Sequence, residues 1–398
     1  MLNPEEQLAL LRRGTVEIIP ETELLAYLQK GIPLRIKMGV DPTAPDVHLG
    51  HTVVMRKLRA FQDLGHQVVL IVGDYTATVG DPSGKNKTRP RLSHEEVLEH
   101  SKTYQDQFFK IVDRTKTEIH FNGSWFGKMP FSEVTRLMSQ ITVAQMLERE
   151  DFAKRYESGQ PISLHEFLYP MMQGYDSVAI QSHVELGGTD QKFNILRGRE
   201  LQKIEGQSPQ VGVLLPILLG TDGREKMSKS LGNLIGLNES AQSMVHKLIN
   251  IPDDLIESYF TLLTHRPLQE TEGLTQKIKD GLQNPVELKQ ALALDIATQY
   301  HGEVSAQEAL AQEKKIHSGE ALPEDIPCLT LAAGEAWPVT LLVQLGWVKS
   351  NGEARRFIQN GGVSWDDQKI LDPQAKVQVT QTHLLKLGKR NFAHIKAL

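Results

Sequence analysis

The sequence predicts an α/β protein in which a doubly wound parallel sheet comes first, followed by an all-α domain and a small α/β domain. Three observations support this prediction. Up to residue 230, short apolar runs alternate with runs of helical periodicity, which is typical of parallel strands joined by helices. After Gly232, helical patterns continue without a strand-like run until about residue 334. From there to residue 398, short strand-like and helical runs are mixed again.

The strands of the sheet are predicted from the most apolar runs. The segment QVVLIVGDY (67–75) is almost wholly apolar, as expected of a strand covered by helices on both faces. Pro216 lies in the last apolar run and has no backbone N–H, which predicts an edge strand or a bulge there. Ser93 and Glu96 are spaced as a capping box at the start of a helix. We predict strands at 34–41, 67–75, 117–125 and 211–220, and helices at 51–65 and 93–112.

The domain boundaries are placed where the pattern changes. Residues 1–230 form the sheet domain, which has a largely helical insertion at about 126–185 between the two halves of the sheet. Residues 231–318 form the all-α domain. A stretch with glycine, two prolines and acidic residues follows, and it marks a linker at 319–333. The small α/β domain then covers 334–398.

Composition and charge narrow the class of protein. The chain has 398 residues, and no apolar run approaches the ~18 residues that span a bilayer. A single cysteine, Cys328, excludes an internal disulfide framework and a multi-cysteine zinc site, and it favours a cytoplasmic setting. Residues 335–398 hold nine Lys/Arg against five Asp/Glu, so they carry +4 of a total of −5 and the rest carries −9. This basic module suggests a polyanionic partner, although an ordinary solvated face is the alternative.

Two histidines and a glycine lie where a helix is expected to begin, in the segment HLGH (48–51). The free N–H groups and positive dipole end of a helix N-terminus attract anions, and Gly50 leaves room for a close approach. His48 and His51 can donate hydrogen bonds to phosphate oxygens as charge develops. Asp41 ends the first strand, where doubly wound sheets bind ligands. The alternative is that one histidine packs in the core while the other is solvated.

A second cationic motif is the loop KMSKS (226–230), which follows the glycine-bearing segment GTDGRE. Lys226 and Lys229 are three residues apart and are accompanied by small hydroxyl residues, including Ser230. Lysine is a compact point charge suited to phosphate, so the loop can act as a mobile clamp. A solvated charged turn is the alternative interpretation.

In this order, the two motifs resemble the hallmarks of class I aminoacyl-tRNA synthetases, with Leu49 for the more usual isoleucine. From about residue 34 to the C-terminus the chain is similar to the bacterial tyrosyl-tRNA synthetases, through DPTAPDVHLGH, GDPSGKNKTR, YPMMQGYD, GGTDQ and KMSKS. The resemblance implies a Rossmann-like catalytic domain. It also implies activation of L-tyrosine by ATP, with release of pyrophosphate, and transfer of tyrosine to the 3′-terminal adenosine of tRNA(Tyr). Mg²⁺ is expected to accompany ATP, and the sequence shows no ligand set for it.

The tyrosine pocket is predicted on one helix. Tyr169, Gln173 and Asp176 are spaced to share one helix face. The resemblance implies that Asp176 accepts the phenol O–H, and that Tyr169 and Gln173, together with Asp81, surround the α-ammonium group. The other residues that it assigns to tyrosine are Asp41, Thr76 and Gln191.

The resemblance also assigns residues to ATP. Gly188 and Asp190, in GGTDQ, would contact the ribose, although two glycines and an aspartate also suit an ordinary turn. Leu218 and Leu219 would contact adenine, with plain sheet core as the alternative. The remaining assignments are Gly50, Lys229 and Ser230 to ATP, His48, His51, Lys226 and again Lys229 to catalysis, and Lys85 and Arg89 to the leaving pyrophosphate.

One position departs from the family pattern. Many bacterial relatives carry a tyrosine near the phenol where this sequence has Lys37. A cation there could keep Asp176 ionised, but we favour the interpretation that Lys37 is an exposed strand lysine.

Binding of tRNA and dimer formation are expected by resemblance alone. Residues 339–373 resemble an S4-type RNA-binding fold, with Arg355 and Arg356 on a short helix where they would meet RNA phosphates. The helical domain would address the anticodon arm. A homodimer through the helical insertion is expected, and apolar residues near 126–175 support it.

Three other functions fit parts of the sequence. A small-molecule nucleotidyltransferase can share the HxGH helix start, but it would not need the helical domain or the basic tail. An RNA-binding paralogue without catalysis would not need intact HLGH and KMSKS motifs. A tryptophan-specific relative would have little use for Asp176, because indole has no phenolic donor there.

Overall fold

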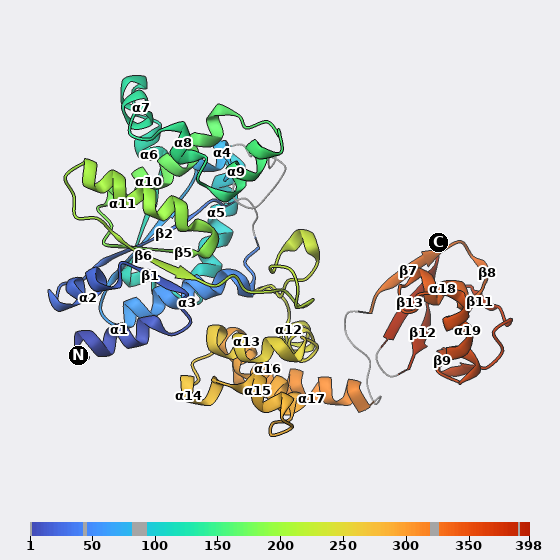
Figure 1. Cartoon of the computed structure of the whole chain (residues 1–398). Helices are drawn as coiled ribbons and strands as arrows, with labels where there is room; N and C mark the ends of the chain where they lie inside the picture. The colour runs from blue at the N-terminus through green and yellow to red at the C-terminus, as the bar shows by residue number, and fades with distance from the viewer. Residues whose placement is uncertain (1, 43–45, 82–93, 319–325, 389–390) are drawn as a thin grey trace. The chain divides into compact units, whose positions relative to one another are not determined.

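A computed structural model describes residues 2–42, 46–81, 94–318, 326–388 and 391–398 (Figure 1). The chain divides into two compact units, which are described separately. The first comprises residues 1–238 and 251–285, and the second comprises residues 239–250 and 286–398. No helix in the described part of the chain is long and apolar enough to cross a membrane.

A six-stranded sheet forms the centre of the first unit, in the order β1-β6-β5-β2-β3-β4. β1 pairs antiparallel with β6, and all other pairs are parallel. The chain runs outward from β2 through β3 to β4 and then returns to β5 and β6 on the other side of β2. The predicted doubly wound sheet is therefore confirmed, with its switch point between β2 and β5. The strands are β1 (Glu17–Ile19), β2 (Arg35–Val40), β3 (Gln67–Val72), β4 (Thr117–Phe121), β5 (Val184–Gly188) and β6 (Val211–Leu215).

Three details of the sheet differ from the sequence prediction. β5 was not predicted, because it carries Glu185 and is apolar for only part of its length. β1 was not predicted, because it has only three residues, none of them buried. Pro216 does not mark an edge strand or a bulge. β6 ends at Leu215, one residue before the proline, and it has a neighbour on each side. The strand stops where the next residue has no N–H to donate, so Pro216 limits its length instead of its position.

Helices cover both faces of the sheet, with α10 and α11 on one side and α1 and α3 on the other (Figure 1). α3 buries Leu49, Val53, Leu58 and Phe61 on its inner side, and Gly65 follows its end with a φ of 93°. Ser93, half of the expected capping box, lies outside the described residues. The helices up to this point are α1 (Pro4–Arg12), α2 (Glu21–Gln29), α3 (Leu49–Asp63), α4 (Thr76–Val79), α5 (His94–Phe108), η1 (Arg114–Lys116) and α6 (Gly123–Phe126).

Short helices fill the segment between β4 and β5, where a helical insertion is predicted. Leu137, Met146, Met171 and Leu201 form a small core that joins them to the helix after β5. The elements are α7 (Phe131–Met138), α8 (Val143–Met146), α9 (Glu150–Glu157), η2 (Leu164–Phe167), α10 (Leu168–Ile180), η3 (Thr189–Gln191) and α11 (Lys192–Ile204).

The segment after β6 is helical, as the sequence predicts. Within the first unit it forms η4 (Lys229–Leu231), η5 (Asp253–Leu255), α13 (Ile256–Leu263), α14 (Leu268–Thr271) and α15 (Leu274–Lys279). Within the second unit, α12 (Ala241–Ile249) packs on α17 (Glu303–Ser318), and the buried Glu313 accepts hydrogen bonds from Gln242 and His246. α16 (Pro285–His301) completes this helical part.

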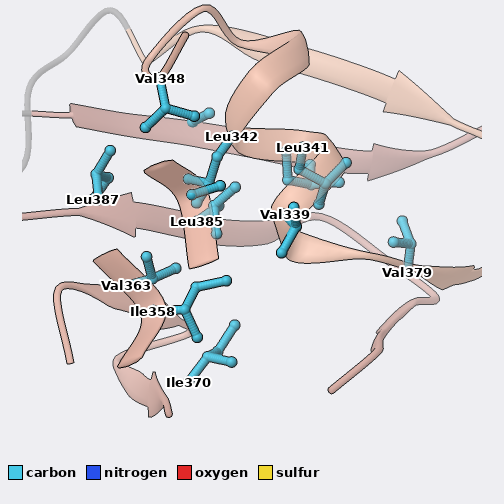
Figure 2. Packing of buried hydrophobic residues seen from close by; sticks show 13 residues of the cluster. Val339, Leu341, Leu342, Val348, Ile358, Val363, Ile370, Val379, Leu385 and Leu387 are labelled. Atoms are coloured by element: carbon cyan, nitrogen blue, oxygen red, sulfur yellow. The ribbon is translucent and has the colours of Figure 1, made fainter. Parts of the chain in front are cut away.

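The C-terminal module has a core of its own, shown in Figure 2. Leu342 of α18, Ile358 of α19 and Leu385 of β12 belong to this core. One sheet has the order β10-β9-β12-β13-β7, and β11 pairs with β8 in another. The elements are β7 (Cys328–Leu331), β8 (Gly334–Ala336), α18 (Pro338–Gln344), α19 (Asn351–Gln359), β9 (Val363–Trp365), β10 (Gln368–Ile370), β11 (Val377–Val379), β12 (His383–Leu387) and β13 (Asn391–Ala397).

Candidate active site at the switch point of the sheet

Most of the predicted site residues in the first unit lie at or beyond the carboxyl ends of the central strands. Asp41 follows β2, Thr76 follows β3, and Gln191 follows β5. In doubly wound sheets, ligands bind in the crevice outside the strand ends at the switch point, here between β2 and β5. Tyr169, Gln173 and Asp176 reach the same region from α10.

A buried carboxylate defines one end of the site. Asp176 is 3% exposed, and its Oδ1 accepts a hydrogen bond from Trp125 Nε1 at 3.0 Å. Its Oδ2 accepts from Asn122 Nδ2 at 3.3 Å. Burial raises the pKa of Asp176 to about 7, against the opposing effects of the Lys37 charge and of these two donors. A carboxylate offers about four acceptor sites, so Asp176 can accept a further O–H from a ligand.

A second carboxylate is held between β2, β3 and α10. Asp41 Oδ1 accepts from Thr76 Oγ1 at 2.7 Å, and Asp41 Oδ2 accepts from Tyr169 Oη at 2.8 Å. Asn122 Nδ2 donates to Thr76 Oγ1 at 3.0 Å, which connects this group to Asp176. The pKa of Tyr169 is raised well above its ordinary value by burial and by the nearby carboxylates, so its O–H stays a donor. Asp41, Thr76 and Tyr169 therefore lie together.

Gly73 makes this arrangement possible, because a Cβ there would lie 2.0 Å from Asp41 Oδ1 and 2.2 Å from Thr76 Oγ1. We expect Gly73→Ala to break the Asp41–Thr76 hydrogen bond and to lower the free energy of unfolding by about 2 kcal/mol. Urea-induced unfolding followed by circular dichroism measures this change. Gly39→Ala is the matched control, since a Cβ at Gly39 meets nothing within 4 Å of the described structure. Equal effects of the two substitutions would contradict the expectation.

The opposite end of the site is a chain of polar side chains. Gln191 Nε2 donates to Asp81 Oδ2 at 3.1 Å. Asn194 Nδ2 donates to Gln173 Oε1 at 2.8 Å and to Gln191 Oε1 at 3.1 Å. Buried Arg149 lies 3.5 Å from Asp81 and donates to Asn194 Oδ1 at 3.2 Å. The three residues predicted for this end, Asp81, Gln173 and Gln191, are thus brought together.

Sequence reasoning missed four residues that hold the predicted ones in place: Asn122, Trp125, Arg149 and Asn194. Asn122 follows directly on β4, and a polar residue at the carboxyl end of a sheet strand is a signal that could have identified it. Arg149 and Asn194 have no such signal, because the contacts that tie them to Asp81 and Gln173 join residues far apart in the sequence.

The favoured interpretation of Lys37 as an exposed strand lysine is wrong. The side chain is fully buried, and its Nζ lies 3.0 Å from Glu185 Oε1 in an ion pair. The same Nζ donates to Gln173 O and to Ser177 Oγ, each at 2.7 Å. The sequence could not show this, because Glu185, the partner that permits burial of the charge, belongs to a strand almost 150 residues further along.

The two histidines of HLGH lie together at the N-terminus of α3. Their rings stack with centroids 3.8 Å apart, and His51 Nδ1 accepts from the His48 backbone N–H at 3.2 Å. Burial, together with the charge of His51, lowers the pKa of His48 to about 3, so His48 is neutral at pH 7. His48 Nδ1 is buried and has no hydrogen-bond partner within the described structure. Both rings are half-buried, so the alternative of one packed and one solvated histidine does not describe them.

The KMSKS loop lies against this helix start. A Cβ at Gly50 would lie 3.6 Å from Met227 Cβ, and Leu49 N donates to Ile235 O at 2.9 Å just after the loop. Met227 N donates to Leu218 O at 3.0 Å, and Leu218 is buried. HLGH and KMSKS begin at His48 and Lys226, 178 residues apart in the sequence, yet they lie against each other in the structure.

The charged side chains of the loop are exposed. Lys226 and Ser230 face solvent, and Lys229 Nζ pairs with Asp46 Oδ2 at 2.5 Å. Leu219 is only partly buried, and its carbonyl accepts from Tyr259 Oη at 2.7 Å.

The predicted ribose residues lie at the end of β5. Gly188 is its last residue, and a Cβ there would lie 2.5 Å from Asp190 Oδ1, so the Asp190 carboxylate folds over Gly188. Asp190 is exposed. Gly188 is not merely part of a solvated turn, since it pairs with Leu215 of β6.

The remaining predicted residues lie elsewhere. Lys85 and Arg89 lie outside the described residues. Arg355 and Arg356 are exposed on α19 of the second unit, and the Arg355 guanidinium lies over the Trp337 ring, 5.5 Å from its centroid. Over the described ranges, His, Cys, Asp and Glu form no group of three or more that could hold a metal ion.

Two protein-family models together match residues 29–395 of the chain. The family model "tRNA synthetases class I (W and Y)" matches residues 29–318, and "Tyrosine--tRNA ligase SYY-like C-terminal domain" matches residues 319–395. The tyrosine–tRNA ligase of Moorella thermoacetica is 49% identical over 98% of this chain and 95% of its own length. That of Thermotoga maritima is 50% identical over 99% of this chain and 98% of its own length.

Solved structures agree in fold. A C-terminally truncated mitochondrial tyrosyl-tRNA synthetase from Aspergillus nidulans superposes with a TM-score of 0.65 at 24% identity, covering 79% of this chain and 94% of the other. A tyrosyl-tRNA synthetase from Archaeoglobus fulgidus, complexed with L-tyrosine, gives 0.62 at 21% identity, covering 77% and 99%. With a matching family model over most of its length and bacterial relatives at about 50% identity, this chain belongs to the bacterial tyrosyl-tRNA synthetases of class I.

Proposed function

We propose that this chain is a tyrosine–tRNA ligase that activates L-tyrosine with ATP and transfers it to the 3′-terminal adenosine of tRNA(Tyr). The observation that carries the proposal is one switch-point site with a buried carboxylate at one end and contacting HLGH and KMSKS motifs beside it. Relatives named tyrosine–tRNA ligase match nearly the full chain, which favours this function over a small-molecule nucleotidyltransferase or a tryptophan-specific enzyme.

Tyrosine recognition is proposed to use both ends of the site. Asp176 accepts the phenol O–H, because each of its buried oxygens has one donor in the structure and the carboxylate can accept a further one. The α-ammonium group lies among Asp81, Gln173 and Tyr169, where carboxylate, amide and phenol oxygens can accept its three N–H groups. Residues that shape the same pocket are Asp41, Thr76 and Gln191.

Activation is proposed to need no general base, because the tyrosine carboxylate is already ionised at neutral pH. One of its oxygens bonds to the α-phosphorus of ATP while the bond to the pyrophosphate oxygen breaks, and pyrophosphate leaves with that electron pair. His48, His51, Lys226 and Lys229 stabilise the charge that develops on the phosphate oxygens. A neutral His48 can do this as an N–H donor. In the second step, the terminal adenosine hydroxyl attacks the tyrosyl carbonyl and AMP leaves.

ATP is proposed to bind as its magnesium complex, with Mg²⁺ arriving on the phosphates as part of the substrate. Its ribose would lie by Gly188 and Asp190, and its adenine by Leu218 and Leu219. The phosphates would lie at Gly50 and the N-terminus of α3, near Ser230. Lys85 and Arg89 are proposed for the leaving pyrophosphate on the resemblance alone.

The Lys229–Asp46 ion pair has to separate before Lys229 can reach a phosphate. Both side chains are about half or more exposed, so the pair contributes less than about 1 kcal/mol. We expect Asp46→Asn to release Lys229 and to lower the KM for ATP, by no more than about fivefold, without changing the KM for tyrosine. Steady-state pyrophosphate exchange at varied ATP measures this. Lys229→Ala is the comparison variant, and its KM for ATP should rise. A rise in both variants would show that Asp46 supports ATP binding directly.

Partners and location are proposed as follows. The +4 C-terminal module, with Arg355 and Arg356 on an exposed helix face, would bind tRNA phosphates, and the 231–318 helices would address the anticodon arm. The cytoplasm is the proposed location, because ATP and tRNA meet there.

We also propose a homodimer through the helices between β4 and β5. Phe131, Val143 and Leu164 lie there and are 84%, 61% and 79% exposed in the single chain. Sedimentation equilibrium tests this, and a monomer at micromolar concentration would reject it.

Tyrosine-dependent exchange of pyrophosphate into ATP tests the activity. Exchange with tyrosine, and at most a trace with phenylalanine or tryptophan, is the expected result. The absence of exchange with tyrosine would reject the proposed function.

A further inference from the structure

Two opposite charges face each other inside the sheet at its switch point. Lys37 of β2 lies directly opposite Glu185 of β5 in the strand register, and they belong to the short pairing that joins the two halves of the sheet. Their side chains are 0% and 1% exposed, and their ion pair is 3.0 Å long. Burial of two charges is costly, so a pair at this point calls for an explanation.

The pair is bonded to the turn of α10 that carries Asp176. Lys37 Nζ has three N–H groups and three partners: Gln173 O, Ser177 Oγ and Glu185 Oε1. Glu185 also accepts from Gln173 Nε2 at 3.1 Å and from Ser177 Oγ at 3.0 Å. Residues 173 and 177 flank Asp176 in this helix. Since all three N–H groups of Lys37 are used, Lys37 acts on a ligand through Asp176 and does not bind the ligand itself.

The charges that face Asp176 come from both strands of the switch point. Lys37, on β2, lowers the pKa of Asp176, and Glu185, on β5, raises it. Tyr169, on the same helix as Asp176, is a neutral phenol. Burial is the largest effect and raises the pKa of Asp176, while Asn122 and Trp125 lower it as donors. The resulting pKa of Asp176 is about 7. Loss of the Lys37 charge should therefore raise this pKa, and loss of the Glu185 charge should lower it.

We propose that Lys37 is a positioning and specificity-determining residue for tyrosine. Together with Glu185, it fixes the turn that carries Asp176. Through its own charge, it favours the ionised form of Asp176, which accepts the phenol O–H. This inference rests on the proposed function for its substrate. A protonated Asp176 is a weaker acceptor, so tyrosine use should rise with pH as Asp176 ionises. Removal of Lys37 should move that rise to higher pH, and removal of the Glu185 charge should move it to lower pH.

The test measures kcat/KM for tyrosine by pyrophosphate exchange between pH 5.5 and 8.5, because this ratio reports ionisations of the free enzyme. The variants are Lys37→Met, Glu185→Gln and the double variant. With wild type rising around pH 7, we expect Lys37→Met to shift the midpoint upward by about one pH unit. At pH 6 this shift gives about a tenfold loss in kcat/KM for tyrosine beyond any loss at pH 8.5, while the KM for ATP stays unchanged. Glu185→Gln should shift the midpoint downward, and the double variant should return toward wild type.

Lys57→Met is the matched control. Lys57 is also a buried lysine, but its Nζ donates to Leu11 O and Arg13 O at the end of α1, so its loss should leave the midpoint in place. A merely structural role for Lys37 would lower activity equally at every pH. An unmoved midpoint in both Lys37→Met and Glu185→Gln would overturn the proposal. If Lys37→Met fails to fold, the downward shift expected of Glu185→Gln decides the question.

A measurement without substrate separates this inference from the proposed function. The carboxyl ¹³C shift of Asp176, in protein labelled at aspartate and assigned with Asp176→Asn, gives its titration directly. A higher midpoint in Lys37→Met supports the role of Lys37 even if wild type shows no tyrosine exchange. An unchanged titration beside normal wild-type exchange rejects the Lys37 proposal and leaves the proposed function standing.

Discussion

Replacement of Asp176 by alanine is expected to lower kcat/KM for tyrosine at least about 100-fold while the KM for ATP stays within about threefold of wild type. The variant loses a hydrogen bond between the phenol O–H and a buried carboxylate, and bonds to charged groups contribute about 1.5–3 kcal/mol. It also leaves the Trp125 and Asn122 donors without the acceptor that they now share. The HLGH and KMSKS motifs keep their own contacts, so ATP binding should persist.

Pyrophosphate exchange at varied tyrosine and varied ATP separates the two constants. Phenylalanine is the control substrate, because it has no hydroxyl for Asp176 to accept. Its kcat/KM should change far less than that of tyrosine, so the preference for tyrosine should narrow. A comparable loss for tyrosine and for ATP would show that Asp176 does not bind the phenol.

The centre of the sheet could be predicted because its strands are buried on both faces. β3 and β6 are almost wholly buried, and burial on both sides requires apolar residues at successive positions. β2 and β4 also lie within predicted runs, although β4 is an edge strand with no fully buried residue. β1 has only three residues, and it is a strand because it pairs with β6. This pairing is a tertiary contact, so the local sequence pattern does not predict it. β5 is apolar for only part of its length and carries Glu185, whose charge is tolerated because of Lys37.

The candidate site could be predicted in part for a similar reason. Residues that meet a ligand occur in short ordered motifs, and the structure brings Asp41, Thr76, Tyr169 and Asp176 together by hydrogen bonds through Asn122. Arg149 and Asn194, which hold Asp81 and Gln173 in place, belong to no motif, because these contacts join residues far apart in the sequence. Lys37 shows the limit most clearly, since only the fold reveals that its charge is paired.

The ion pair of Lys37 gives the second large expected effect. Glu185→Leu should lower the free energy of unfolding by about 3–5 kcal/mol, because it leaves the Lys37 ammonium buried without its opposite charge. Urea-induced unfolding of the ligand-free protein at pH 7, followed by circular dichroism, measures the loss. The control is Glu118→Leu, which breaks the half-exposed pair with Arg35 on the same strand and should cost less than about 1 kcal/mol. Similar losses in the two variants would contradict the importance of burial.

The double variant Lys37→Met/Glu185→Leu then separates stability from function. Apolar residues that replace both members of a buried pair often cost nothing, so most of the stability lost in Glu185→Leu should return. The kcat/KM for tyrosine should stay below wild type at every pH, even though the pH midpoint returns toward that of wild type, because Ser177 and the backbone around Asp176 lose the bonds that the pair makes to α10. A double variant with a near-wild-type free energy of unfolding but a low kcat/KM for tyrosine would mean that the buried charges serve tyrosine recognition and are not needed for stability.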